Sequence, residues 1–321
     1  MYDVTAIGEV LIDFTPAGTS QNGNLLFEQN PGGAPTNCLA AVVRCGGKAA
    51  LISAVGKDQF GVFLKEVVQS AGIEDGGIQF TDEACTTLAF VTLSASGERN
   101  FSFCRKPGAD QRISAEKIDK TLIENCKIFH YGSLSLSDEP ARSAVFEAVR
   151  RAQHMGKLVS YDPNWRPPLW SSREEGVYWM KQGIGYADVL KVSDEELALL
   201  SGFSDPALGT AALMDAYPRL RLVVTTLGDK GCFYRNGAAM GYVDAYEVVP
   251  VDTTGAGDAF WGTVLYHIAQ DSEIISDEIR LAAALDMACA AGALCASGRG
   301  AIPSIADTAQ IKALQARGHR L

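Results

Sequence analysis

The stretch Asp252-Thr-Thr-Gly-Ala-Gly-Asp258 runs directly into the apolar sequence Ala259-Phe-Trp-Gly-Thr-Val-Leu-Tyr-His-Ile-Ala269. Because an apolar segment at 246–251 precedes it, the order predicts a strand, a glycine-rich turn and then a helix. Gly255 and Gly257 allow a tight turn and a close approach of a ligand to the backbone. The first N–H groups of a helix lack helical partners and carry partial positive charge, so this turn is a candidate anion site.

Asp258 places a carboxylate inside the first turn of the predicted helix. A base beside an anion site suits a reaction that removes a proton while negative charge develops nearby, as in phosphoryl transfer from ATP to an alcohol. With an ordinary Asp pKa of ~3.9, this base would be ionised at pH 7. The structural alternative is an acid at a helix start beside two turn glycines.

These seven residues resemble the active-site signature of the ribokinase-like (pfkB-type) carbohydrate kinases. The resemblance implies that Asp258 takes the proton of the sugar hydroxyl. It also implies that the backbone N–H groups of Gly255, Ala256 and Gly257 stabilise the transferring phosphoryl group, while Mg²⁺ bridges the ATP phosphates.

Composition narrows the class of protein. The chain has 321 residues, 47% of them hydrophobic, and a net charge of −10 without a long basic run, which argues against binding to nucleic acid or to anionic membranes. No apolar run reaches the ~18 residues of a membrane span, and the N-terminus reads as a strand rather than a signal peptide. The eight cysteines are scattered without a C-x-x-C pair, as expected of reduced thiols in a cytoplasmic protein.

The order of the predicted elements indicates the fold class. From residue 114 onward strands and helices alternate, which predicts an α/β fold with a doubly wound, mostly parallel sheet and a ligand site at the carboxyl ends of its strands. Residues 87–93 and 99–104 read as a β-hairpin around the turn 94–97. We expect a single domain, 1–321, with lid segments at about 14–30 and 85–110. In the resembling family such a lid covers the sugar and often dimerises, so a homodimer through the lid is possible.

A second motif, Asn30-Pro-Gly-Gly-Ala-Pro-Thr-Asn37, opens another apolar helix. Its glycines bring N–H groups close to a ligand, and an asparagine can both donate to and accept from sugar hydroxyls. Alternatively, Asn37 is only a helix N-cap. Gly-Gly-Ala-Pro-x-Asn is similar to the sugar-site signature of the family, especially its fructokinase branch. The resemblance implies substrate-binding roles for Asp13, Gly32, Gly33, Asn37, Arg105, Arg166 and Asp258.

Two of those roles rest on weaker patterns. Arg105 lies in Cys-Arg-Lys-Pro-Gly-Ala-Asp110, which matches a fructokinase-like Arg-x-Pro-x-Ala-Asp, although a surface arginine at a strand end fits equally. Arg166 lies in Asp162-Pro-Asn-Trp-Arg166, which resembles the Asp-x-Asn-x-Arg stretch of the family near the sugar and phosphates.

The nucleotide site is implied by segments later in the chain. Many members carry Asn-x-x-Glu where this chain has Ser193-Asp-Glu-Glu196, so the asparagine is replaced. A helix capping box explains the same serine and glutamate. The resemblance implies nucleotide-binding roles for Lys191, Ser193, Glu196, Thr226, Gly228, Gly231, Gly255, Gly257 and Cys289.

A monovalent cation site, usually for K⁺, is also implied by the resemblance. Backbone carbonyls beside a carboxylate suit a hard cation, although a glycine loop that ends a helix reads the same way. The matching positions are Asp252, Thr254, Cys295, Gly298, Gly300 and Ser304.

Other nucleotide and hydrolase motifs are absent from the sequence. There is no G-x-x-x-x-G-K-[ST], no G-x-G-x-x-G after the first strand and no G-x-S-x-G. We therefore expect transfer of the ATP γ-phosphate to a sugar hydroxyl, foremost the 6-hydroxyl of fructose. A 2-keto-3-deoxygluconate kinase or a riboside kinase is the alternative within the family, and a non-catalytic, kinase-like sugar-binding regulator is the alternative from another class.

Overall fold

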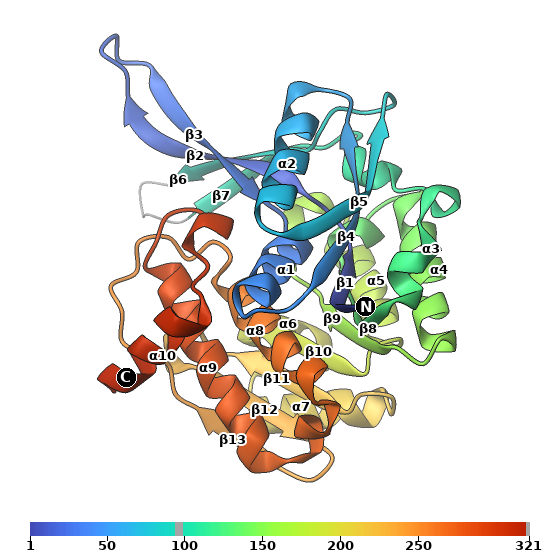
Figure 1. Ribbon diagram of the computed structural model, residues 1–321, viewed down its shortest axis with the longest axis vertical. Helices are drawn as coiled ribbons and strands as arrows, with labels where there is room; N and C mark the ends of the chain where they lie inside the picture. Colours follow the sequence, from blue (N-terminus) through green and yellow to red (C-terminus); the bar gives the residue numbers. More distant parts are fainter. Residues whose placement is uncertain (94–98, 319–321) are drawn as a thin grey trace.

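The computed structural model describes residues 1–93 and 99–318, without the side chains of residues 92, 93 and 99–101. In this part of the chain a large sheet has the order β13-β12-β11-β10-β9-β8-β1-β4-β5 (Figure 1). Neighbours from β5 to β11 run parallel, and β12 and β13 add antiparallel at one edge. The predicted mostly parallel α/β fold is thus confirmed. The strands are β1 Tyr2–Ile7, β4 Ala49–Gly56, β5 Ile73–Thr81, β8 Cys126–Gly132, β9 Leu158–Asp162, β10 Val189–Ser193, β11 Leu222–Thr226, β12 Cys232–Asn236 and β13 Met240–Val243.

Helices cover both faces of this sheet, because alternate residues of its strands point to opposite sides. In β1, Val4 joins the core formed with α1, α8 and α9, whereas Ile7 joins the core formed with α4, α5 and α6. Trp261 of α8 is fully buried in the first core. The helices are α1 Ala34–Arg44, α2 Gln59–Ser70, α3 Lys120–Glu124, α4 Ala141–His154, α5 Arg173–Ile184, α6 Asp194–Ser201, α7 Pro206–Ala216, α8 Ala256–Gln270, α9 Glu278–Ala296 and α10 Thr308–Arg317.

A separate small sheet lies beside the carboxyl end of β1 and has the order β3-β2-β6-β7 (Figure 1). Its strands are β2 Leu11–Thr19, β3 Leu25–Gly32, β6 Leu88–Leu93 and β7 Arg99–Cys104. The predicted hairpin of β6 and β7 is confirmed by their antiparallel pairing, while its predicted turn, 94–97, lies outside the described residues. Phe14 stacks on Phe90 with ring centroids 5.0 Å apart, which ties β2 to β6. This small sheet draws on both segments predicted for the lid, and its closure over a substrate stays a prediction.

The predicted strand at 246–251 is wrong. Only Tyr246 takes part in an isolated bridge, and the following residues up to Pro250 have no regular structure. The segment runs outside the sheet edge, where Val249 is 81% exposed and Val251 is 52% exposed. A strand needs a row of N–H groups paired with a neighbouring strand, whereas Pro250 has no N–H and the N–H of Val251 donates to the carbonyl oxygen of Ala296 at the end of α9. The glycine turn and the helix after it form as predicted.

Helix α9 is long and apolar enough by length and composition to cross a membrane, and the bent pair α6 and α7 would be a second such span. This finding contrasts with the expectation that no apolar run reaches the length of a membrane span. In the fold α9 packs along α8, and Leu281, Leu285 and Ala288 are buried in the core shared with it. Its apolar composition is therefore explained by helix-to-helix packing.

Candidate active site

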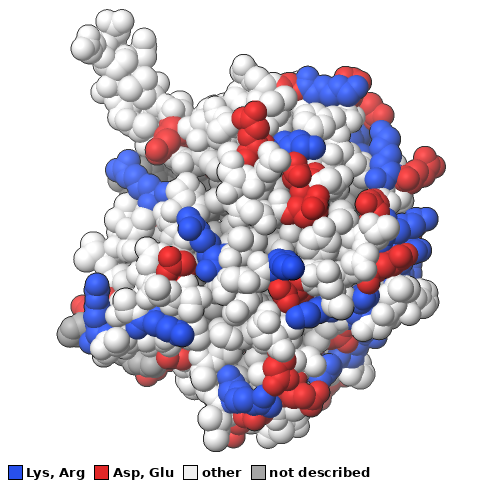
Figure 2. All heavy atoms as spheres, viewed as in Figure 1, with Lys and Arg blue, Asp and Glu red and all other residues white. Residues whose placement is uncertain are grey.

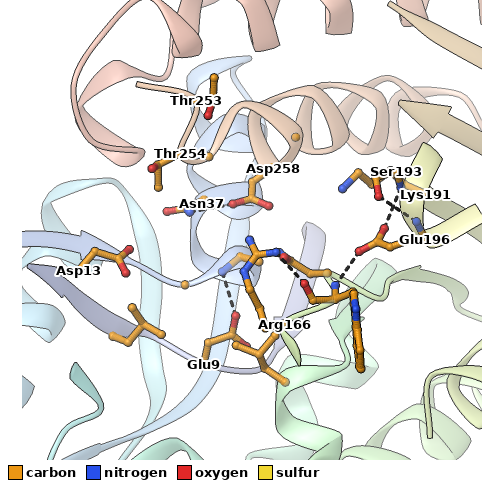
Figure 3. A pocket seen from close by; sticks show the side chains of 18 of the residues that line it. Glu9, Asp13, Asn37, Arg166, Lys191, Ser193, Glu196, Thr253, Thr254 and Asp258 are labelled. Atoms are coloured by element: carbon orange, nitrogen blue, oxygen red, sulfur yellow. Dashed lines mark hydrogen bonds between the residues drawn. The ribbon is translucent and has the colours of Figure 1, made fainter. Parts of the chain in front are cut away.

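Two helices begin at the carboxyl end of the large sheet and aim their first turns at one cavity of about 410 Å³ (Figure 3). Helix α1 starts after Gly33 (φ 114°), and α8 starts after Gly255 (φ 79°). Both first turns border the cavity, and two of their N–H groups already have partners: that of Ala34 donates to Oε1 of Glu9 at 3.0 Å, and that of Ala256 donates to the carbonyl oxygen of Thr253 at 3.2 Å. The cavity is lined by Glu9, Leu11, Asp13, Gly33, Ala34, Asn37, Phe103, Leu134, Asn164, Trp165, Arg166, Lys191, Ser193, Glu195, Glu196, Thr226, Thr253, Thr254, Gly255, Gly257 and Asp258.

The glycines at these turns are required by close backbone approaches. A Cβ on Gly33 would lie 2.5 Å from the backbone oxygen of Glu9, and one on Gly255 would lie 2.5 Å from Cβ of Ala301. A Cβ on Gly32 would collide with the carboxylate of Asp13. Gly32 does not itself line the cavity, but it leaves the room that Asp13 needs.

Asp258 and Asn37 lie next to each other in the cavity wall, and their side chains point toward each other (Figure 3). Nδ2 of Asn37 donates a hydrogen bond of 2.8 Å to Oδ2 of Asp258, and both residues are buried. Oδ1 of Asn37 is buried without a hydrogen-bond partner among the described residues. A buried acceptor of this kind is costly unless a donor reaches it, so it suits a hydroxyl group of a substrate.

The electrostatics of Asp258 differ from the sequence expectation. Burial, together with the nearby carboxylate of Asp162, raises the pKa of Asp258 to about 6, against the opposing effects of Lys191 and Asn37. Asp258 is still mainly ionised at pH 7, but it is a stronger base than an exposed aspartate. Burial likewise raises the pKa of Asp13 to about 7, partly offset by the charge of Arg166.

Lys191 and Asp162 form a buried ion pair at the same end of the sheet, with 2.9 Å between Nζ and Oδ2. Although burial favours the neutral amine, Asp162, Glu196 and Asp258 raise the pKa of Lys191 above its ordinary value. A permanent cation therefore lines the cavity close to the first turn of α8, where a Cβ on Gly257 would lie 3.2 Å from Nζ. This position suits contact with phosphate.

A second cavity, of about 500 Å³, lies on the other side of the α8 start. It contains five of the predicted nucleotide-binding positions: Thr226, Gly228, Gly231, Gly257 and Cys289. Tyr246, Val248 and Phe260 add an apolar wall. Thr226, Thr253 and Gly257 line both cavities, so the two hollows meet at the first turn of α8.

Ser193 and Glu196 form a capping box at the start of α6. This is the structural role that the sequence analysis gives as the alternative to nucleotide binding. One carboxylate oxygen of Glu196 accepts from the backbone N–H of Ser193 at 2.8 Å, and the other accepts from that of Trp165 at 2.6 Å. Both side chains nevertheless line the first cavity. The cap therefore orients Glu196 at the site instead of competing with a functional role.

The residues of the implied cation site lie on the loop before α8, at the end of α9 and on the loop that follows it, and Thr254 among them lines the first cavity. Asp252 accepts hydrogen bonds from the N–H groups of Thr254 (2.9 Å) and Gly300 (3.2 Å), which joins the loops. Sγ of Cys295 lies 3.7 Å from the carbonyl oxygen of Thr254. A Cβ on Gly298 would collide with the side chain of Ser304. The donors are carbonyl oxygens and one carboxylate, which fits an alkali cation better than a transition metal. No cluster of three His, Cys, Asp or Glu side chains suited to a metal occurs among the described residues.

Arg105 does not line the first cavity. Its side chain is 3% exposed and its guanidinium is paired with Asp110, at 2.6 Å between Nη2 and Oδ2. It instead borders a polar hollow beside β7. Its predicted contact with the substrate would have to be indirect in this arrangement.

Sequence reasoning missed several residues of the two cavities, most notably Glu9. Glu9 is 1% exposed, and its Oε1 accepts a hydrogen bond of 3.0 Å from the N–H of Ala34. The available signal was a charged residue two positions after the last residue of β1, at the carboxyl end of a parallel strand, where ligand sites concentrate. Asn164 is the asparagine of the Asp162-Pro-Asn-Trp-Arg166 stretch, whereas Leu134 and Tyr246 carried no comparable signal.

Comparison with known proteins agrees with this geometry. Residues 1–309 match the pfkB family carbohydrate kinase. The chain belongs to the pfkB family of carbohydrate kinases. It is 44% identical over 304 residues to fructokinase-2 of Solanum lycopersicum, covering 94% of this chain and 92% of that protein. It is 43% identical over 310 residues to fructokinase-1 of Oryza sativa subsp. japonica, covering 96% of both.

Solved structures of pfkB-type kinases have the same fold. The fructokinase of Xylella fastidiosa with bound ATP matches with a TM-score of 0.91 and 33% identity, over 99% of this chain and 100% of that one. The fructokinase of Vibrio cholerae O395 in its fructose-, ADP- and calcium-bound form matches with a TM-score of 0.88 and 32% identity, over 97% and 98%. The similarity thus covers the small sheet as well as the large one.

Proposed function

We propose that the protein is a fructokinase, which transfers the γ-phosphate of ATP to the 6-hydroxyl of D-fructose. The observation that carries the proposal is the position of Asp258, a buried base in the first turn of α8, where the two cavities meet. The first cavity takes the sugar and the second takes the adenosine part of ATP. The fructokinases that this chain resembles over nearly its full length support fructose as the sugar.

Asp258 accepts the proton of the attacking hydroxyl as the oxygen bonds to the γ-phosphorus, and ADP leaves with the bonding electron pair. The hydroxyl becomes acidic only as it attacks, so a carboxylate with a pKa near 6 is a sufficient base. We assign the stabilisation of the charge on the transferring phosphoryl group to the N–H groups of Gly255, Ala256 and Gly257, of which that of Ala256 donates to the carbonyl oxygen of Thr253 in the structure. Lys191 adds a fixed cation on the same side.

Substrate positioning falls to side chains from β2, from α1 and from the loop after β9. Asn37 and Asp13 bind hydroxyl groups, and Arg166 lies between the sugar and the phosphates. Thr226, Gly228, Gly231 and Cys289 shape the nucleotide cavity. Mg²⁺, when bound with ATP, neutralises phosphate charge. Ser193 and Glu196 face that region, and we assign the loops of Asp252 and Gly300 to K⁺.

The small sheet is proposed to close over the sugar and to pair with a second copy of the chain. The β2–β3 hairpin projects from the body, and Figure 2 shows no charged side chain near its tip. Leu25 and Leu26 on β3 are 55% and 46% exposed, which suits an apolar contact between copies. The eight free cysteines fit the reducing cytoplasm, where we place the enzyme.

A coupled ADP-release assay with Mg-ATP and K⁺ tests the proposal. Fructose, tagatose, ribose, 2-keto-3-deoxygluconate and a nucleoside are compared side by side. We expect fructose to give the highest kcat/KM. A higher value for another substrate overturns the fructose assignment and keeps the kinase chemistry, whereas no turnover of any of them by folded, ATP-binding protein overturns both.

A further inference from the structure

Arg105 and Asp110 form a solvent-inaccessible ion pair next to the first cavity, which is called the sugar cavity below. The guanidinium of Arg105 donates to Asp110 from Nε (2.9 Å) and Nη2 (2.6 Å), to Oγ of Ser137 (2.8 Å) and to the carbonyl oxygen of Leu134 (3.0 Å). The side chain of Asp110 is fully buried and that of Arg105 is 3% exposed. Every nitrogen of the guanidinium therefore has a partner within the protein.

Leu134 and Glu9 connect this pair to the substrate. Both line the sugar cavity, and the carbonyl group of Leu134 is the one that Arg105 holds. Burial raises the pKa of Glu9 to about 8, with Asp110 adding to the effect and Arg105 opposing it. Glu9 is therefore mostly protonated at pH 7. The charges of Arg105 and Asp110 cancel. The part of the cavity wall formed by Glu9 and Leu134 therefore carries no net charge.

The other cations of the cavity are also balanced by acids. Arg166 lowers the pKa of both Asp13 and Asp258, against the larger effect of their burial, so its charge is shared by two carboxylates. Lys191 pairs with Asp162. A substrate carboxylate at the wall of Glu9 and Leu134 would therefore be a buried anion without a counter-charge, which is strongly unfavourable.

We propose that Asp110, by neutralising Arg105, is a specificity-determining residue that makes the cavity accept an uncharged sugar and reject a sugar acid. The inference rests on the proposed function and extends it from fructose to a class of excluded substrates. A sugar acid differs from a neutral sugar of similar size by the negative charge of its carboxylate, which would lie against the wall of Glu9 and Leu134. A site discriminates best where the wrong substrate leaves such a charge unpaired.

The experiment measures kcat/KM for fructose and for 2-keto-3-deoxygluconate in the wild-type enzyme and in two variants. Asp110→Asn removes the counter-charge of Arg105, and Glu9→Gln combined with Asp110→Asn prevents Glu9 from ionising to replace it. We expect the ratio of kcat/KM for the sugar acid to that for fructose to rise about tenfold or more in the double variant, and less in Asp110→Asn. Asp138→Asn is the matched control, because Asp138 borders the same hollow as Arg105 without bonding to it, and its ratio should not change.

A purely structural role for Asp110 would lower kcat/KM for both sugars in parallel, and that result overturns the proposal. If the variants do not fold, calorimetric titration of the wild-type enzyme decides. Binding of 2-keto-3-deoxygluconate at least about 100-fold weaker than fructose supports the proposal, and comparable binding overturns it. If the wild-type enzyme uses another neutral sugar instead of fructose, the fructose assignment is wrong but the role of Asp110 can still be tested. The ratio of kcat/KM for the sugar acid to kcat/KM for that neutral sugar is then measured.

Discussion

The side chain of Asn37 donates a 2.8 Å hydrogen bond to Oδ2 of Asp258, and so joins the first turns of α1 and α8 across 221 residues of sequence. The residue expected to hold the sugar thus also orients the expected base. The two sequence motifs, 30–37 and 252–258, meet in space, since each leads into a helix that begins after a glycine and borders the same cavity. A shift of either helix would misplace both substrate and base.

Replacing the base tests the proposed chemistry. Asp258→Asn keeps the size of the side chain and an acceptor for Asn37, but it cannot take a proton. We expect kcat to fall roughly 10²–10⁴-fold while fructose still binds. Steady-state kinetics and calorimetric titration with fructose measure the two effects. Near-normal turnover in this variant would rule Asp258 out as the base.

The pH profile follows from the pKa of Asp258. Burial raises this pKa to about 6, and the group must be ionised to act. Because this pKa is that of the substrate-free protein, we expect kcat/KM for fructose to fall about tenfold per pH unit below pH 6. The hydrogen bond from Asn37 lowers this pKa, so Asn37→Ala should move the falling limb to higher pH. A limb near pH 4, the ordinary range for aspartate, would contradict the buried position.

The same shift in pKa has a consequence for stability. Asp258 binds its proton more tightly in the folded chain (pKa about 6) than at the ordinary value of 3.8. Ionisation therefore costs stability that is fully felt above pH 6 and disappears as the pH falls toward 4. We expect Asp258→Asn to raise Tm by a few degrees at pH 8, with a much smaller effect near pH 4. A lower Tm at pH 8 would show that the ionised carboxylate stabilises the fold.

The parts of the site that sequence predicted best are those set by local backbone chemistry. Glycines followed by apolar helices located the starts of α1 and α8, since a helix start depends on its own few residues. The pKa of Asp258 was not predictable, because it depends first on the burial of its carboxyl group and then on Asp162, which β9 brings alongside. Glu9 was missed for the same reason: its burial comes from α1 packing over the end of β1.

Elements at the sheet edge were harder to predict than those in its centre. The apolar residues at 246–251 suggested a strand, yet the described part of the chain has no strand beyond β13 to pair with them. Pairing partners are a tertiary property that a local apolar pattern does not contain. The role of Arg105 depended similarly on Asp110, whose position five residues along the chain did not by itself reveal a buried ion pair.

Gly255 offers a test of the helix start. A Cβ there would both strain a left-handed backbone (φ 79°) and collide with Ala301. Gly202, with φ 85° and nothing within 4 Å of a built Cβ, is the matched control. Gly202→Ala should cost about 1–2 kcal/mol of stability without changing kcat. Gly255→Ala should cost more and lower kcat at least about tenfold, because the anion site moves. Equal effects of the two substitutions on kcat would show that the turn has no role beyond folding.

Asp252 tests the assignment of the two adjoining loops to K⁺. Its carboxylate accepts hydrogen bonds from the N–H groups of Thr254 and Gly300. It therefore joins the two loops and places a negative charge beside their carbonyl oxygens. Asp252→Asn retains the acceptor oxygen of an amide but removes the charge, which should weaken cation binding. We expect K⁺ to stimulate the wild-type enzyme relative to a tetramethylammonium salt of equal ionic strength, and the variant to need at least about tenfold more K⁺ for half-maximal activity. Because the loop also precedes Gly255, the variant is compared at saturating K⁺, where kcat should recover if the charge acts through the cation. A kcat that stays low at every K⁺ concentration would mean that Asp252 instead supports the α8 start directly.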